Sequence, residues 1–112
     1  MSSGFIETGL SNEALLIHRA LASLQEELEA IDYYHQRADV SHDEALKSIL
    51  LHNRDDEMEH ATMLMEWLRR TMPEFDGQMK KLLFTSGDLI ELAAGPGPLA
   101  ESGRGLGLGN LK

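Results

Sequence analysis

Glu57 and His60 are the residues whose types and spacing most clearly indicate chemistry, because they lie three apart in the segment Glu57-Met-Glu-His60. On an α-helix, residues three apart share one face, where a carboxylate and an imidazole can coordinate one cation or bridge two. The chain has no cysteine, so no thiolate can favour zinc. Carboxylate with imidazole suits iron or manganese. The same spacing also occurs by chance on solvated acidic helix faces, so the prediction of a metal site depends on where the motif lies and on a partner for it.

Glu27 is the expected partner of this motif from a second helix. It lies three residues after Leu24 and four before Ile31, which turns it toward the same packed side. In an antiparallel hairpin with its turn near residue 40, the heights of Glu27 and Glu57 differ by only about 6 Å at helical rise. We therefore expect the two carboxylates and His60 to converge at one level.

The first helix that positions these residues is predicted over residues 11–38. This stretch contains no glycine or proline, and its apolar side chains recur at helical spacing. Ser11 or Asn12 is available as the N-cap. Asp39 and Val40 are expected to form a short break before the next helix.

The second helix is predicted from about residue 42 to residue 71. Ser41 and Glu44 have the Ser-x-x-Glu spacing of a capping box, and the restriction on the residue before Pro73 favours an end there. Two short helices are expected over residues 75–84 and 86–94. Nothing in the sequence shows strand-type alternation, so the fold class is all-α.

A seam of mostly apolar side chains is predicted along each long helix. On the first helix it comprises Ile17, Leu21, Leu24, Leu28, Ile31, His35 and Ala38, and on the second Leu46, Leu50, Asn53, Glu57, His60, Leu64 and Trp67. Three consecutive positions of the second seam are polar. A carboxylate and an imidazole placed there cost several kcal/mol unless they are paired or metal-bound.

One chain supplies only half of a di-metal site. A Glu from one helix and a Glu-x-x-His from another are half of the ligand set of di-iron carboxylate bundles, which use two such halves. A hairpin of two helices is also too thin to bury its own seam. Dimerisation about a two-fold axis would complete both a four-helix bundle and the site, with Glu27, Glu57 and His60 contributed twice.

Composition excludes several classes of partner and divides the chain in two. With 19 acidic and 10 basic residues and a net charge of −9, the 112-residue chain would repel nucleic acid. It has no apolar run of about 20 residues for a membrane span, and the lack of cysteine fits a reducing cytoplasm.

Residues 95–112 hold six of the ten glycines and two of the three prolines. We therefore predict a helical domain over residues 1–94 and a flexible linker with a terminal peptide over residues 95–112.

Two other residue pairs allow alternative metal sites. Asp32 and His35 share the same spacing as Glu57 and His60, but His35 is expected about three turns away from Glu57. His52 and Asp56 form a row with His60 at spacings of four on the second helix, a possible second metal face, and a surface pair is the simpler interpretation of the first two. A further alternative is a non-catalytic helical interaction module, in which the polar seam residues only fix register and oligomeric state.

Three segments together give the chain a specific family resemblance. Glu26-Glu-Leu-Glu-Ala-Ile-Asp-Tyr-Tyr34, His52-Asn-Arg-Asp-Asp-Glu57-Met-Glu-His60 and Glu66-Trp-Leu-Arg-Arg70 resemble the encapsulated ferritins in motif order and distance. The resemblance implies a ferritin-like four-helix bundle formed by two chains. It also implies a ferroxidase that oxidises Fe(II) to Fe(III) with O₂ at a di-iron centre shared between them.

The same resemblance assigns expected roles to individual residues. Glu27, Glu57 and His60 take the iron-ligand positions, and Tyr34 matches an aromatic position close to the centre. Glu26 and Glu29 match acidic positions that attract and pass on incoming iron. Tyr33 stands where tryptophan is common. A di-manganese site or another di-iron oxygen chemistry is the alternative that keeps the metal.

The C-terminal segment completes the resemblance. Residues 105–112, with leucines at 106, 108 and 111, look like the cargo peptide that docks such enzymes on the inner wall of an encapsulin shell, with Asn110 where serine is frequent. The resemblance then implies a ring of dimers, expected to be a decamer, inside an encapsulin nanocompartment of a prokaryotic cytoplasm. Iron storage would fall to the surrounding shell.

Overall fold

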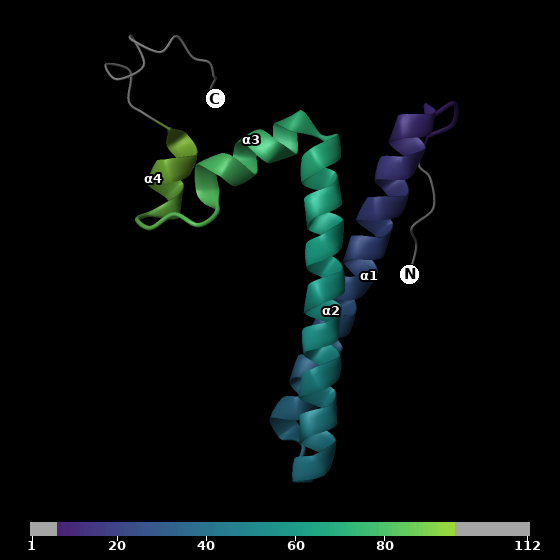
Figure 1. Cartoon of the computed structure of the whole chain (residues 1–112), viewed down its shortest axis with the longest axis vertical. Coiled ribbons are helices and arrows are strands. Elements are labelled where there is room, and N and C mark those ends of the chain that lie inside the picture. The colour runs from purple at the N-terminus through teal and green to yellow at the C-terminus, as the bar shows by residue number, and fades with distance from the viewer. Residues whose placement is uncertain (1–6, 96–112) are drawn as a thin grey trace. The chain divides into compact units, whose positions relative to one another are not determined.

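The computed structural model describes residues 7–95, which contain four helices. Figure 1 shows their course. These are α1 (Asn12–Val40), α2 (Glu44–Thr71), α3 (Pro73–Leu82) and α4 (Leu89–Ala94), and the described residues contain no β-strand. The predicted all-α architecture with two long helices and two short ones is confirmed. The chain divides into two compact units at the boundary between Thr71 and Met72.

The N-terminus of α1 is capped as expected. Ser11 is the N-cap, and its hydroxyl oxygen accepts a hydrogen bond from the amide of Ala14 at 3.1 Å. The predicted break at Asp39 and Val40 is wrong, because α1 continues to Val40. The amide of Ser41 donates to the carbonyl of Ala38 at 3.3 Å and closes the last turn.

The predicted capping box at Ser41 is also wrong, since α2 begins at Glu44. The carboxylate of Asp43 accepts a hydrogen bond from the amide of Leu46 at 2.8 Å, and the Ser41 hydroxyl donates to the carbonyl of Asp43 at 3.2 Å. An aspartate next to the first helical residue provides a charged acceptor for a free helix amide, so it takes the capping role. The turn is thereby restricted to three residues.

The two long helices of the first unit lie side by side and run antiparallel (Figure 1). The side chains buried between them are mostly small, namely Ala20, Ala38, Ala61 and Leu68. Several predicted seam residues are instead largely exposed, among them Leu28 at 46% and Leu46 at 48%. Two helices bury only a narrow stripe of each other, so the rest of each apolar face stays uncovered in a single chain.

The second unit contains the two short helices. Pro73 occupies the first turn of α3, where it needs no hydrogen-bond donor, and extended Met72 precedes it. The turn between α3 and α4 is longer than predicted because Phe84 and Gly87 have φ angles of 58° and 109°, which no helix accommodates. Asp88 then caps α4 through the amide of Glu91 at 2.9 Å.

Within residues 7–95, no helix combines the length and apolarity needed to cross a membrane. The predicted boundary at residue 94 and the terminal peptide lie at or beyond the edge of the described residues. They remain predictions.

Candidate metal centre

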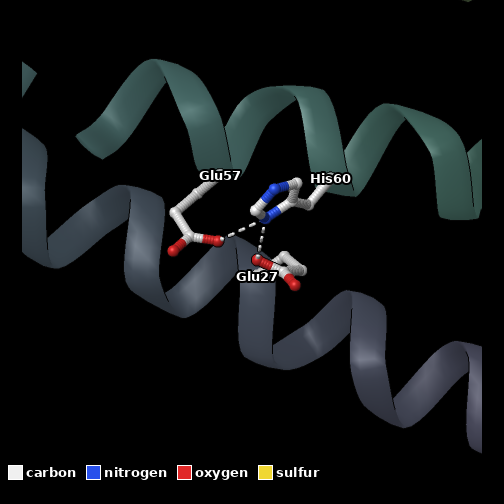
Figure 2. A group of neighbouring side chains, drawn as sticks. All are labelled: Glu27, Glu57 and His60. Carbon is white, nitrogen blue, oxygen red and sulfur yellow. Dashed lines mark hydrogen bonds and ion pairs between the residues drawn. The ribbon is translucent and has the colours of Figure 1, made fainter. Parts of the chain in front are cut away.

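Glu27 from α1 and Glu57 and His60 from α2 point toward one another (Figure 2). The Nδ1 atom of His60 lies 3.2 Å from Glu57 Oε1 and 3.7 Å from Glu27 Oε1. One ligand atom from each residue lies within 4.8 Å of the other two. Among the described residues, no other group of three or more potential ligands meets this criterion.

The positions of the helix ends bring Glu27 and Glu57 to the same height. Glu27 lies 13 residues before Val40, where α1 ends, and Glu57 lies 13 residues after Glu44, where α2 begins. Both carboxylates are therefore about 20 Å from the turn at 1.5 Å per residue. The offset of about 6 Å expected from the sequence disappears because the turn is displaced along the chain by a few residues.

The three side chains of this cluster shift one another's pKa values. A hydrogen bond with Glu57 raises the pKa of Glu27 above its usual range and lowers the pKa of Glu57. The pKa of the His60 imidazole is raised, chiefly by its hydrogen bond with Glu57. A raised pKa for Glu27 beside a lowered pKa for Glu57 is the pattern expected where two carboxylates lie close together and joint ionisation is disfavoured.

The donor set fits a divalent transition metal. Two carboxylate oxygens and one imidazole nitrogen converge, and iron, manganese and zinc all accept such ligands. The Glu27 and Glu57 side chains are 26% and 24% exposed, whereas that of His60 is 47% exposed. The cluster is therefore open on one side, which leaves room for further ligands from outside the chain.

Tyr34 and Glu26, the other residues expected near the site, both lie on α1. Tyr34 is half-buried, and the guanidinium carbon of Arg37 lies 6.0 Å from the centre of its ring. Glu26 is exposed and directly precedes Glu27. Their roles in chemistry and iron capture remain predictions.

Glu29 is held by a contact that the sequence analysis missed. The Tyr33 hydroxyl donates to Glu29 Oε2 at 3.2 Å, and this hydrogen bond raises the pKa of Tyr33. Arg37 lies 5.9 Å from the Tyr33 ring, one further turn along α1. The spacing of four residues between Glu29 and Tyr33 was the available signal.

The alternative pairs do not join the cluster. Asp32 accepts a hydrogen bond from Gln36 at 2.9 Å, and His35 contacts Arg54 of α2. His52 lies 3.3 Å from Asp56 in a pair whose side chains are 73% and 52% exposed. This arrangement agrees with the expected surface pair.

The antiparallel helix pair with its carboxylate and histidine cluster has the features of a ferritin-like helical protein. Residues 6–86 match the sequence profile of the EncFtn-like family, so the chain belongs to this family of encapsulated ferritins.

Individual relatives agree with this assignment. The "Encapsulated ferritin-like protein" of Rhodospirillum rubrum is 44% identical over 115 aligned residues, covering 92% of this chain and 82% of that protein. The "Ferritin-like protein" of Thermotoga maritima is 54% identical over 74 residues, 66% of this chain. The match spans 65% of the T. maritima protein, slightly less than two thirds of its length.

A solved structure confirms the fold. The crystal structure of protein ne0167 from Nitrosomonas europaea superposes with a TM-score of 0.74 at 51% sequence identity. The superposition covers 77% of this chain and 97% of the other.

Proposed function

We propose that this protein is a ferroxidase that oxidises Fe(II) to Fe(III) with O₂ at a di-iron site shared between two chains. The convergence of Glu27, Glu57 and His60 on one open position carries the proposal. Membership of the EncFtn-like family supports an iron-related role for this cluster.

A second chain is part of the proposal because one chain supplies an incomplete set of metal ligands. Three ligands are half of the set that a di-iron carboxylate site needs. α2 also carries exposed apolar side chains before and after His60, among them Met58 at 43% and Trp67 at 38% exposed. A second copy placed against this side would cover the apolar surface and supply another Glu27, Glu57 and His60.

The residues of the cluster would bind iron and manage protons. The lowered pKa of Glu57 favours the ionised carboxylate that a metal needs, whereas the raised pKa values of Glu27 and His60 make protons compete with the metal at those two ligands. Carboxylates accommodate both oxidation states of iron and the net negative charge attracts Fe(II). The electron transfer to O₂ is the chemistry that iron itself supplies.

Aerobic addition of Fe(II), followed by ferric absorbance, tests the ferroxidase. Glu27→Ala or His60→Ala should reduce the rate by at least about 100-fold, because each removes a direct ligand, and the loss of a group that only orients a ligand already costs about 10–100-fold. Glu59→Ala is the matched control, since it removes an exposed carboxylate one residue before His60. Equal rates in all three variants and the parent would refute the proposal, and oxidation of Mn(II) in preference would favour a manganese site.

We further propose that residues 105–112 dock the protein inside an encapsulin shell, as a ring of dimers whose iron is stored by the shell. This segment lies outside the described residues, and the proposal is supported by the alternating leucines and by the name of the R. rubrum relative. Co-expression with a shell protein provides the test. A chain truncated after Pro98 should remain outside the shell, and its encapsulation at the parent's level would contradict the docking role.

A further inference from the structure

Arg54 connects the two long helices through a directed polar contact. Its Nη1 atom lies 3.1 Å from His35 Nδ1 on α1. Its Nε and Nη2 atoms donate to Asp55 Oδ1 at 3.1 and 2.9 Å. The Arg54 side chain is 23% exposed, compared with 62% for Asp55. Asp55 therefore orients the guanidinium plane from the solvent side, and the free edge points at α1.

The chemistry of the two groups fixes the direction of this hydrogen bond. A guanidinium carries only donors and stays protonated in proteins, so His35 Nδ1 must accept. The histidine is then neutral, with its proton on Nε2. Nδ1 is thereby unavailable to a cation, which agrees with the absence of His35 from the ligand cluster.

Apart from the contacts of Glu27 with Glu57 and His60, the fully buried side chains between the helices give little directional restraint along the axis. Ala20, Ala38 and Ala61 are three of the four side chains buried between α1 and α2. Small apolar side chains let helices approach closely, but hydrophobic contact has no direction. The three-residue turn restrains one end only, and the ligand cluster lies about 20 Å away from it at helical rise.

The contact lies between that turn and the ligand cluster. Arg54 is three residues before Glu57, and His35 is eight residues after Glu27. Side chains on a helix tilt toward its N-terminus. In an antiparallel pair, Arg54 therefore leans toward the turn and His35 away from it, so their side chains converge. A shift of one helix along the other would separate them and would equally separate Glu27 from Glu57.

We propose that Arg54, acting through His35, is a positioning residue that fixes the axial register of α1 against α2 and thereby holds Glu27 level with Glu57 and His60. The inference rests on the proposed metal-binding function of the cluster and adds a residue outside it. On α2, Arg54 and His60 are six residues apart, which separates them by about 120° around the helix axis at 100° per residue. They therefore flank opposite sides of the buried stripe. Arg54 therefore holds the register without occupying the open side of the site.

Binding of Co²⁺ to the full chain tests the proposal, because its visible spectrum reports coordination geometry without any oxidation. Arg54→Met keeps the aliphatic stem but loses the guanidinium. We expect Co²⁺ affinity to fall about tenfold with an altered spectrum, as it does when groups that orient metal ligands are lost. Arg70→Met is the matched control. Arg70 lies on the same helix and is 73% exposed, and its bond to Glu66 stays within α2. It should leave Co²⁺ binding unchanged.

Substitution of His35 provides the second arm, since this residue is exposed and its replacement opens no cavity in the buried core. His35→Gln retains an acceptor for Arg54 and should bind Co²⁺ like the parent, whereas His35→Leu should match Arg54→Met. Parent-like affinity and spectrum in both Arg54→Met and His35→Leu would overturn the positioning role. Equal losses in Arg70→Met would also overturn it.

The outcomes for the parent chain separate the two proposals. If the parent binds Co²⁺ but oxidises no Fe(II), the ferroxidase proposal fails while the variants still decide the positioning role. If the parent binds no Co²⁺, the metal site is refuted and the positioning role with it.

Discussion

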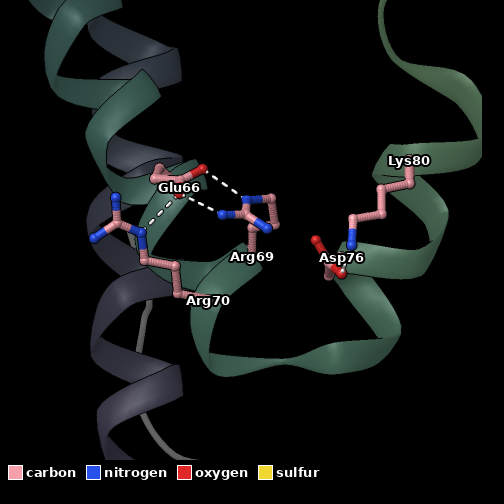
Figure 3. Close-up of polar contacts among 5 residues, drawn as sticks. All are labelled: Glu66, Arg69, Arg70, Asp76 and Lys80. Carbon is pink, nitrogen blue, oxygen red and sulfur yellow. Dashed lines mark hydrogen bonds and ion pairs between the residues drawn. The ribbon is translucent and has the colours of Figure 1, made fainter.

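Two glutamates on the same helix, Glu57 and Glu66, have opposite electrostatic surroundings. Glu66 accepts hydrogen bonds from Arg69 and Arg70, each with a contact of 2.7 Å (Figure 3). These two cations lower its pKa to about 2. Glu57 instead faces Glu27 and His60, and no arginine or lysine of the described residues contributes to the lowering of its pKa.

The comparison shows why only one cluster is a candidate binding site. Around Glu66, two guanidinium groups more than balance one carboxylate, so an additional cation would gain nothing there. Around Glu57, two carboxylates converge with one imidazole, and the balancing charge has to come from protons or from a metal. An unbalanced cluster held by packed helices is the arrangement that binds cations.

Introducing a fixed cation beside Glu57 should give it a charge balance like that of Glu66. Of the changes predicted here, it should have the largest effect on metal affinity. Asn53→Arg places a guanidinium four residues before Glu57, on the same side of α2 and within reach of its carboxylate. We expect metal affinity to fall by about 100-fold, comparable to the loss of a ligand. Isothermal titration with Co²⁺ measures the change, and Asn53→Gln is the control of similar size. Unchanged affinity would mean that charge imbalance does not drive binding.

The metal affinity of the cluster of Glu27, Glu57 and His60 should depend on pH. A metal replaces protons on Glu27 and His60, whose pKa values are raised, so affinity should fall as the pH drops through the pKa of His60. Each proton released changes affinity by up to about tenfold per pH unit. Titrations with Co²⁺ between about pH 6 and pH 8 measure this slope, because histidine changes charge in that range. A flat profile would contradict the proton-sharing arrangement.

Neutralising Glu27 should stabilise the metal-free protein slightly. A raised carboxyl pKa means that the ionised form is disfavoured in the folded state, so stability decreases as the pH rises above the usual value near 4.5. Glu27→Gln removes that charge, and we expect a gain within about 1 kcal/mol at neutral pH. Thermal unfolding in a chelator measures it, and the gain should vanish in acid. A loss of stability at neutral pH would be the contrary result.

Neutralising Glu66 should lower the stability of the protein, in contrast to Glu27. The change should be the smallest of those predicted, because the ion pairs of Glu66 are solvent-exposed. A lowered pKa stabilises the fold above the usual value of 4.5, and this contribution is lost as the pH falls toward about 2. Glu66→Gln should therefore lower the unfolding temperature at neutral pH, and the difference should shrink in acid. Metal binding should not change. A measurable effect of this variant on iron oxidation would show that the two clusters are coupled.

The sequence by itself determined the helices and the face on which each ligand lies. The lack of glycine and proline, the Ser11 cap and the restriction before Pro73 are local features, and each fixes one end or one stretch of a helix. Spacing within one helix also places Glu57 and His60 on one face, whatever the helix packs against. Family membership likewise follows from the sequence.

The tertiary structure decided how one helix is placed against the other. Asp43 took the capping role that the sequence predicted for Ser41, and this displaced the turn and brought Glu27 level with Glu57. The contact between Arg54 and His35 joins residues 19 apart in the chain. Helical periodicity repeats within a single helix and contains no information on the axial offset between two helices, so only the folded hairpin shows which side chains meet.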